Sequence, residues 1–366
     1  MLNNKTVAVV VPAYNEITQI RLVIESMPAF VDRIIIVNDC SKDKTADLVA
    51  EIIAAQPLSG ITLPNTLDSP HETTRYNRAD LEVLRMQKEE IVLFNPHEVF
   101  NKNPDNERVI LINHTKNGGV GAAISTGYKW CKDHNIDCTA VMAGDGQMDP
   151  GELESICRPV VDEEVDYVKG NRLIHRSAWV LIPKVRYFGN SILSILTKMA
   201  SGYWHVSDTQ TGYTAISLSA MKAVALHKIY RSYGMPNDLL VKLNIAFCTL
   251  REVEIKPIYQ VGEQSKMKIF KVIPRVSMLL VVSFFKRLWI KYLFRDFHPL
   301  FLLYNFSFLL MIFVVIYGVK ILSYVVSGLD VNPVTLLAFA LLFISSFQAL
   351  LFAMWMDIQD NERLYK

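Results

Sequence analysis

The residues best equipped for chemistry lie in the segment Ala140–Pro150, which reads AVMAGDGQMDP. Asp145, Gln147 and Asp149 follow an apolar run there, and their oxygen atoms are ligands that suit Mg²⁺ or Mn²⁺. Gly144 keeps the neighbouring backbone accessible to a ligand. A divalent ion at this point would offset the negative charge that develops on a leaving diphosphate. An acidic turn before a helix is the structural alternative.

Two earlier segments end in residues that suit a nucleoside. Val10–Glu16 reads VVPAYNE, and its Tyr14 offers a ring on which a base can pack. Ile34–Thr45 reads IIIVNDCSKDKT, and Asp39 ends its apolar run, where a buried carboxylate needs a partner. A uracil or guanine N–H, or a ribose hydroxyl, would supply that partner. Capping of the following helix is the alternative role for Asp39.

A glycine-rich segment, Asn113–Trp130, reads NHTKNGGVGAAISTGYKW. Asn117 and Gly118 stand just before a helix-like stretch, and the N-terminus of a helix favours an anion such as a diphosphate. The spacing matches neither the P-loop nor the dinucleotide-binding fingerprint. We therefore expect Asn117 and Gly118 to bind substrate, with a simple tight turn as the alternative.

The elements that would position these residues follow an α/β pattern. Short apolar runs cover residues 7–11, 34–37 and 109–112, and helix-like stretches cover 16–27, 44–55 and 120–132. Continuous apolar runs suit parallel strands that are covered on both faces. Such sheets bind ligands at the carboxyl ends of their strands, so the polar segments above should meet at one edge. Residues 57–107 form a long polar segment that we expect to be a surface insertion, with a substrate lid as the alternative.

The C-terminal third has the composition of a membrane anchor. Residues 297–319 and 331–356 contain no Asp, Glu, Lys or Arg, and each exceeds the roughly 20 residues that a membrane helix needs. We expect a two-helix hairpin over 297–356, with both ends on one side.

The segment 264–296 before this hairpin is basic. We expect juxtamembrane amphipathic helices whose basic side faces anionic lipid, with an ordinary helix docked on the enzyme domain as the alternative. The positive-inside rule then places residues 1–263 and the tail 357–366 in the cytoplasm. The basic residues are Lys266, Lys268, Lys271, Arg275, Lys286, Arg287, Lys291 and Arg295.

Composition narrows the function classes. The net charge of the 366 residues is only +2, so no overall basic field indicates a nucleic-acid partner. The five cysteines are odd in number and form no C-x-x-C pair, which argues against a disulfide framework or a zinc site.

In their order and spacing, these segments resemble the family-two inverting glycosyltransferases of the GT-A fold. The resemblance continues through GNR (170–172), VRYFGN (185–190), SDTQTGYTAIS (207–217) and GEQSKMKI (262–269). With the basic segment and the hairpin, the chain looks like the branch of dolichyl-phosphate mannose synthases and polyprenyl-phosphate glycosyltransferases. The implied fold is a Rossmann-like, mostly parallel sheet with helices on both faces, and the insertion 57–107 lies outside the resemblance.

The resemblance also implies a role for each matching residue. Ala143 stands where the family writes the first Asp of its Asp-x-Asp-x-Gln metal motif, which leaves fewer carboxylates for the ion. The nucleoside would be held by Pro12, Tyr14, Glu16 and Asp39, the metal by Asp145 and Gln147, and the acceptor phosphate by Arg172, Arg186 and Asn190, with Asp208 near the sugar and Lys266 near the diphosphate.

The implied reaction is inverting transfer of a hexose or N-acetylhexosamine from a UDP- or GDP-sugar to a polyprenyl (dolichyl or undecaprenyl) phosphate. An ionised phosphate needs no strong base, so Asp145, Asp208, Arg172 and Arg186 would act by alignment and charge neutralisation. A sugar hydroxyl acceptor would instead need Asp208 or Asp238 as a base. Two alternatives stay open: a transferase that extends a lipid-linked or surface glycan, and an inactive membrane scaffold. A homo-oligomer is compatible with the sequence.

Overall fold

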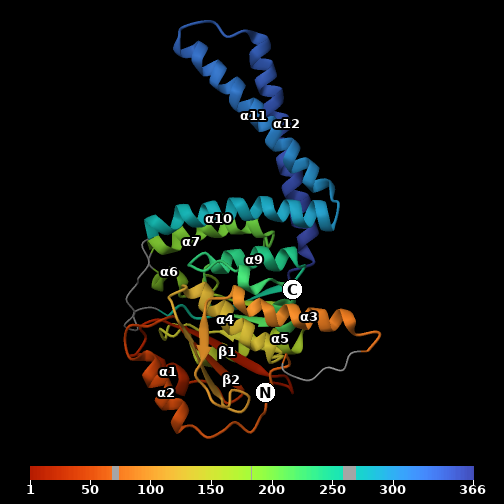
Figure 1. The fold of residues 1–366 in the computed structure, drawn as a ribbon. Coiled ribbons are helices and arrows are strands. Elements are labelled where there is room, and N and C mark those ends of the chain that lie inside the picture. The colour runs from red at the N-terminus through yellow and green to blue at the C-terminus, as the bar shows by residue number, and fades with distance from the viewer. Residues whose placement is uncertain (68–73, 183, 259–268) are drawn as a thin grey trace.

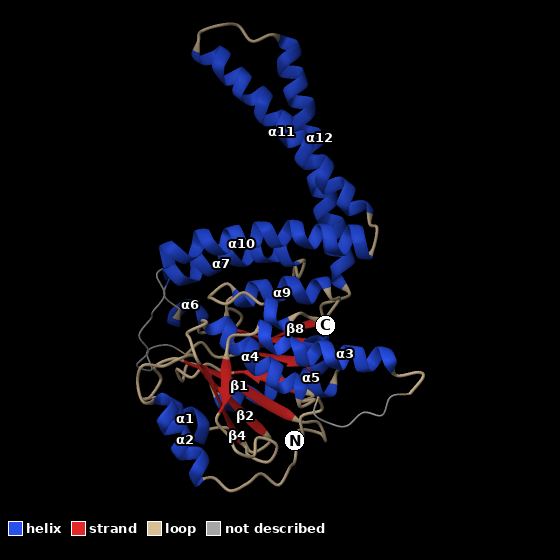
Figure 2. Ribbon diagram, in the orientation of Figure 1, coloured by secondary structure: helices blue, strands red, loops and turns tan. Residues whose placement is uncertain are grey.

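The computed structural model describes residues 1–67, 74–182, 184–258 and 269–366, without the side chains of 184–188, 190 and 269–272. Its first part is built on one eight-stranded sheet with the order β3-β4-β2-β1-β5-β7-β6-β8 (Figure 2). The strands are β1 (Val7–Ala13), β2 (Arg33–Asn38), β3 (His97–Val99), β4 (Val109–His114), β5 (Cys138–Val141), β6 (Tyr167–Asn171), β7 (Thr214–Ser217) and β8 (Leu250–Glu254).

The sheet is mostly parallel, as predicted. Strands β4, β2, β1 and β5 run parallel, and so do β6 and β8. Two strands run the other way: β3 is antiparallel to β4, and β7 is antiparallel to both β5 and β6. The three apolar runs predicted as strands are β1, β2 and β4, and every residue of β2 is buried.

Helices cover both faces of the sheet, which is why its strands are continuously apolar. One core contains side chains from α1 (Ile20–Glu25), α2 (Thr45–Ala55) and α5 (Leu153–Asp162). The opposite core contains side chains from α4 (Val120–Asp133) and α9 (Met235–Ile245). The architecture confirms the α/β class expected from the sequence.

Helix α4 lies especially close to the sheet. A Cβ atom added at Gly127 would lie 2.4 Å from Cγ1 of Val10 in β1, so only glycine allows this approach. The close packing holds the first turn of α4 in a fixed place beside the carboxyl ends of β1 and β2.

Two long helices follow the sheet and project away from it (Figure 1). Helices α11 (Pro299–Val326) and α12 (Pro333–Glu362) have 28 and 30 residues and are apolar enough to cross a membrane. Each begins with proline at its first position and a side-chain cap, from His298 and Asn332 respectively. They pack on each other along their length, and most of their large apolar side chains are exposed.

Between the sheet and this hairpin lie α7 (Lys184–Ser201) and α10 (Ile269–Trp289), which run side by side (Figure 1). From residue 269 on, where the structure describes it, the basic segment is one α-helix followed by a short π-helix over Ile290–Arg295. Helix α10 packs on α7 and α9, as the docked-helix alternative supposed, yet it also exposes Val281 and Phe285.

Two of the basic residues assigned to lipid headgroups do not face lipid. The Arg287 guanidinium donates to both carboxylate oxygens of Asp357, at 2.8 and 2.7 Å, and both side chains are fully buried. Lys291 Nζ is also buried and donates to Asn361 Oδ1 at 2.6 Å. The prediction is wrong for these two residues because α12 supplies the acidic and amide partners, and a buried charge requires such partners.

The end of the chain returns to the sheet. Helix α12 continues through Glu362, and the last residues then lie along β8. The Leu250 N–H donates to the Leu364 carbonyl at 2.7 Å, and the Lys366 N–H donates to the Leu250 carbonyl at 2.9 Å. The segment predicted as a cytoplasmic tail is thus attached to the enzyme domain.

Candidate active site

Loops at the carboxyl ends of β1, β2 and β5 meet at one edge of the sheet. A Cβ atom at Gly144 would lie 3.3 Å from the Pro12 carbonyl oxygen and 3.6 Å from Cγ of Glu16, so the loop after β5 adjoins the loop after β1. The Glu16 N–H donates to Thr45 Oγ1 at 3.1 Å, which joins the loops after β1 and β2. The sequence predicted this meeting of loops. Tyr14 and Glu16, predicted to hold the nucleoside, are half-buried there.

Asp39 is buried at this edge and has protein partners for both carboxylate oxygens. Oδ1 accepts from His114 Nδ1 and from the Gly118 N–H, each at 2.7 Å, and Oδ2 accepts from the Gly119 N–H at 2.8 Å. Burial alone would raise the pKa of Asp39, but the hydrogen bonds from His114, Gly118 and Gly119 outweigh burial and hold that pKa below its ordinary value. The carboxylate therefore binds the loop before α4, and at the start of α2 the Thr45 N–H donates to Asp43 instead.

The loop before α4 is held by hydrogen bonds to other parts of the protein. Asn117 Nδ2 donates to the Asp39 carbonyl at 3.0 Å, and the Gly121 N–H donates to the Arg231 carbonyl at 2.9 Å. Gly119 has φ +87°, and a Cβ there would lie 2.5 Å from the Arg231 carbonyl oxygen, so glycine is required. Asn117 and Gly118 lie at the predicted edge, but the N–H groups of Gly118 and Gly119 already donate to Asp39.

The predicted metal ligands lie on the loop after β5. Asp145 and Gln147 are half-buried, and Asp145 Oδ1 accepts from the Gln147 N–H at 3.1 Å. The described residues contain no group of three His, Cys, Asp or Glu side chains that would hold a metal by themselves. One carboxylate and one amide oxygen fit a divalent ion whose remaining positions are filled by diphosphate oxygens and water.

Arg172 and Asp208, predicted to contact the acceptor phosphate and the sugar, are bonded to each other. Arg172 Nε and Nη2 donate to the Asp208 carboxylate at 2.8 and 3.1 Å, and Asp208 is fully buried. Burial raises the pKa of Asp208, but the charge and hydrogen bonds of Arg172, together with the Lys169 charge, outweigh burial and leave that pKa below its ordinary value. Asp208 thus holds the half-buried Arg172 in place.

Two polar residues beside this pair, the buried Lys169 and the half-buried Glu252, were not predicted. Lys169 Nζ donates to the Thr211 carbonyl at 2.5 Å, and Glu252 accepts from the N–H groups of Ser207 and Asp208 and from Asn171 Nδ2. Burial lowers the pKa of Lys169 to about 8. The sequence carried one signal, a lysine inside the apolar strand β6.

Of the remaining predicted residues, three lie partly or wholly outside the described part of the chain, and Asp238 is described. The backbone of Arg186 and Asn190 lies in α7, but their side chains are outside the described part of the chain, as is Lys266 altogether. Asp238 Oδ2 accepts from the Tyr230 N–H at 2.8 Å and pairs with Lys242 within α9.

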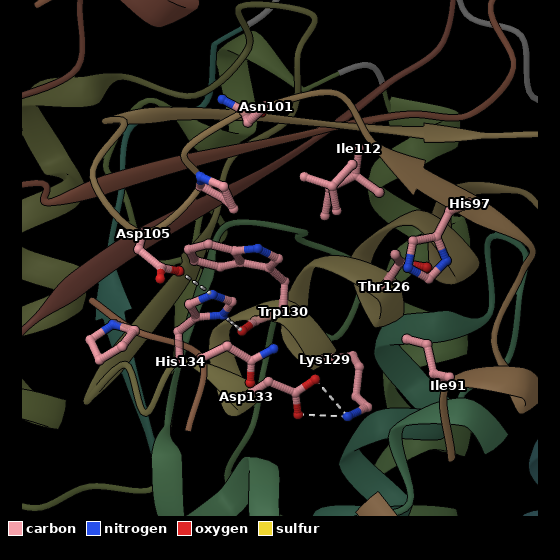
Figure 3. Close-up of a pocket in the computed structure, with 14 residues that line it drawn as sticks. Ile91, His97, Asn101, Asp105, Ile112, Thr126, Lys129, Trp130, Asp133 and His134 are labelled. Carbon is pink, nitrogen blue, oxygen red and sulfur yellow. Dashed lines mark hydrogen bonds and ion pairs between the residues drawn. The ribbon is translucent and has the colours of Figure 1, made fainter. Parts of the chain in front are cut away.

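A pocket of about 550 Å³ lies between α4 and residues 64–65 and 91–105 of the predicted insertion 57–107 (Figure 3). Its charged groups are paired: Lys129 Nζ donates to both oxygens of Asp133 at 2.6 Å, and His134 lies 3.6 Å from Asp105. The residues described as lining this pocket include none of the predicted site residues, so it is separate from the Asp145 loop.

A sequence profile of the glycosyl transferase family 2 matches residues 8–66 and 97–224, just over half of the chain. The chain belongs to glycosyl transferase family 2. The matched residues carry β1 through β7 and therefore the whole edge described above. The gap in the match, residues 67–96, lies inside the segment expected to be an insertion. Family membership and the observed architecture confirm the predicted GT-A fold, and the protein is a glycosyltransferase.

Two curated proteins resemble the chain. The UDP-N-acetylglucosamine–dolichyl-phosphate N-acetylglucosaminyltransferase of Methanococcus voltae is 28% identical over 286 residues, which are 75% of this chain and 96% of that protein. An uncharacterized protein of Methanocaldococcus jannaschii is 30% identical over 153 residues, which are 42% of this chain and 63% of that protein.

Solved structures of similar overall arrangement include glucosyl-3-phosphoglycerate synthase of Mycobacterium tuberculosis. Its complex with Mn²⁺, UDP-glucose and phosphoglyceric acid has a TM-score of 0.46 and 14% identity, covering 78% of this chain and 80% of that one. Another crystal structure of the same synthase has a TM-score of 0.45, covering 78% and 81%. Identity this low transfers no residue roles.

Proposed function

We propose that this glycosyltransferase moves an N-acetylhexosamine from its UDP-sugar onto a polyprenyl phosphate at the membrane surface. The observation that carries the proposal is the similarity to the Methanococcus voltae enzyme, which extends over 96% of that protein and whose name states this donor and a dolichyl-phosphate acceptor. The adjoining loops at Pro12, Asp39 and Asp145 support a nucleotide-diphosphate donor at the same edge.

The proposed chemistry is one displacement at the anomeric carbon. An oxygen of the lipid phosphate forms a bond to that carbon while the bond to the β-phosphate oxygen breaks, and UDP leaves with the electron pair. The anomeric configuration inverts because attack and departure occur on opposite faces. The phosphate is already ionised near neutral pH, so the protein needs no strong base and acts by alignment and charge neutralisation.

In this proposal, each residue at the edge of the sheet has its own role in binding the substrates. Tyr14 and Glu16 would hold the nucleoside, and Asp39 would keep the adjoining loop in place. Asp145 and Gln147 would hold Mg²⁺ or Mn²⁺, which when bound offsets the charge on the departing diphosphate. Arg172, oriented by Asp208, would bind the incoming lipid phosphate, for which a planar guanidinium is well suited.

Exposed apolar side chains support a membrane position for this reaction. On α7, Ile192 and Ile195 are 63% and 59% exposed, and α10 beside it exposes Val281, Phe285 and Trp289. Apolar surface of this extent calls for a lipid or protein cover. We propose that α7 and α10 rest in the headgroup layer, that α11 and α12 cross the bilayer, and that the sheet lies in the cytoplasm.

The test separates the acceptor from the donor. Purified full-length protein is incubated with UDP-N-acetylglucosamine and either polyprenyl phosphate or a polyprenyl-diphosphate saccharide. The proposal expects glycosylated lipid from the monophosphate alone. Product from the saccharide alone would show that the enzyme extends a lipid-linked glycan, and donor turnover with neither lipid would refute the proposed acceptor.

A further inference from the structure

A second, smaller pocket of about 130 Å³ opens at the candidate active site. It lies between the first turn of α4, the end of β5, the loop that follows Asp208 and the start of α9. The residues that line it include Val120, Val141, Gln210, Gly212, Tyr233 and Met235.

The pocket touches both loops that would hold a diphosphate. Val120 directly follows Gly119, whose N–H donates to Asp39. A Cβ atom at Gly212 would lie 3.5 Å from Cε of Met148, the residue after the predicted metal ligand Gln147. A sugar attached to a diphosphate that binds between these loops would therefore lie next to the opening of this pocket.

The lining is chiefly apolar and has one oriented amide. Gln210 Nε2 donates to Thr209 Oγ1 at 2.8 Å and to Asn237 Oδ1 at 3.0 Å. These bonds fix the amide and, within the described part of the chain, leave its Oε1 as an acceptor for a ligand N–H.

We infer that this pocket binds the 2-acetamido group of the donor sugar, an inference that rests on the proposed function. The group offers a methyl for the apolar wall and an N–H for Oε1 of Gln210. The volume is sufficient for its four heavy atoms, since one water-sized group needs only about 10–15 Å³. A plain hexose leaves the apolar wall unfilled, and a charged substituent meets an apolar surface that disfavours it.

The variant Gly212→Val tests the pocket by filling it. The backbone of Gly212 lies outside the left-handed region and its Cβ direction has only ordinary contact with Met148, so the fold accommodates the change. Binding of UDP-N-acetylglucosamine, UDP-glucose and UDP to full-length protein is measured by titration calorimetry. The wild-type protein should favour the acetamido sugar over UDP-glucose, and the variant should reduce that preference by roughly tenfold while UDP still binds.

Gly60→Val is the matched control, because a Cβ at Gly60 has no neighbour within 4 Å. It should leave the preference unchanged. Equal binding of the two sugars by wild-type protein, or an equal loss of both in Gly212→Val, would overturn the inference. A preference for the acetamido sugar that the wild-type protein shows and Gly212→Val weakens supports the inference, even if polyprenyl phosphate proves not to be the acceptor. An undiminished preference in Gly212→Val would overturn it. Wild-type protein that binds no UDP-sugar refutes the subsite and the proposed function together.

Discussion

Asp39 joins two loops of the candidate active site through bonds that were expected to reach a nucleotide. Its position at the end of an apolar strand indicated a carboxylate in need of a partner, and this was correct. The partners are the Gly118 and Gly119 N–H groups and His114, which lie 75 or more residues further along the chain. We therefore propose that the carboxylate acts on the ligand through the loop that it holds.

The variant Asp39→Asn should disturb this loop, because an amide cannot accept from all three donors. We expect UDP affinity to fall about tenfold and the unfolding free energy to fall by about 1–3 kcal/mol, the cost of an unsatisfied buried group. Calorimetry and denaturant unfolding measure the two effects. The exposed Asp47→Asn, on the neighbouring helix, is the control. Unchanged stability in Asp39→Asn would contradict the role assigned here.

Lys169 makes stability depend on pH in a defined direction. The unfolded chain keeps this proton up to about pH 10.5, whereas burial lowers the pKa of Lys169 to about 8 in the folded protein. Between these values the unfolded state binds more protons, so stability should rise with pH. The variant Lys169→Met should remove about 2–3 kcal/mol of this rise, measured as the difference in unfolding free energy between pH 7.5 and 10. An identical slope in both proteins would contradict the burial argument.

At the scale of residues, the sequence predicted the location of a side chain where that location depends on its position at the end of a strand. Asp39 and Asp145 both follow apolar strands, so their shared edge was predictable. The bonds of Asp208 were not, because Arg172 is 36 residues away and nothing local indicates their pairing. Lys169 and Glu252 likewise depend on which strands become neighbours in the folded sheet.

At the scale of elements, long apolar runs were predictable and strand direction was not. Strands β1, β2 and β4 have continuous apolar runs that leave little choice of structure. Strand β7 is only four residues long and inserts antiparallel between β5 and β6, an order set by tertiary packing. The sequence indicated helix α7 only through the motif that contains Arg186. Its exposed apolar face could not be predicted, because that face depends on how α7 packs against α10.

That face gives a prediction for the acceptor. The variant Ile195→Glu on α7 places a charge where we propose lipid headgroups and acyl chains meet. The Michaelis constant for long-chain polyprenyl phosphate in vesicles should rise severalfold, while the constant for a short, water-soluble prenyl phosphate stays unchanged. Leu22→Glu on α1 is the control, since Leu22 is 61% exposed but lies at the far end of the sheet from α10 (Figure 1). Equal effects of both variants would contradict membrane contact at α7.

At the scale of the whole molecule, the hairpin is firmly joined to the enzyme domain. The buried pair of Arg287 and Asp357 links α10 to α12, and Arg287 Nε also donates to the Ala200 carbonyl at the end of α7. The chain end then extends the sheet along β8. Apolar composition predicted the two helices, but composition does not reveal this junction because Arg287 is 70 residues from Asp357 and 87 residues from Ala200.

The junction predicts a large effect of single substitutions. Arg287→Met leaves the Asp357 carboxylate buried without its partner and should lower the unfolding free energy by about 3–5 kcal/mol. The double variant Arg287→Met with Asp357→Leu should recover most of that loss, since two apolar side chains of similar volume replace the pair. Thermal unfolding in detergent measures both. A double variant no more stable than the single one would contradict the pairing.

The central claim is that the lipid phosphate itself receives the sugar. Its most direct measurement is mass spectrometry and anomeric NMR of the lipid recovered after the full-length protein is incubated in vesicles with UDP-N-acetylglucosamine and polyprenyl phosphate. The account predicts one N-acetylhexosamine on the phosphate, with a configuration opposite to that of the donor. Unmodified lipid beside released UDP, or a product that retains the donor configuration, would contradict it.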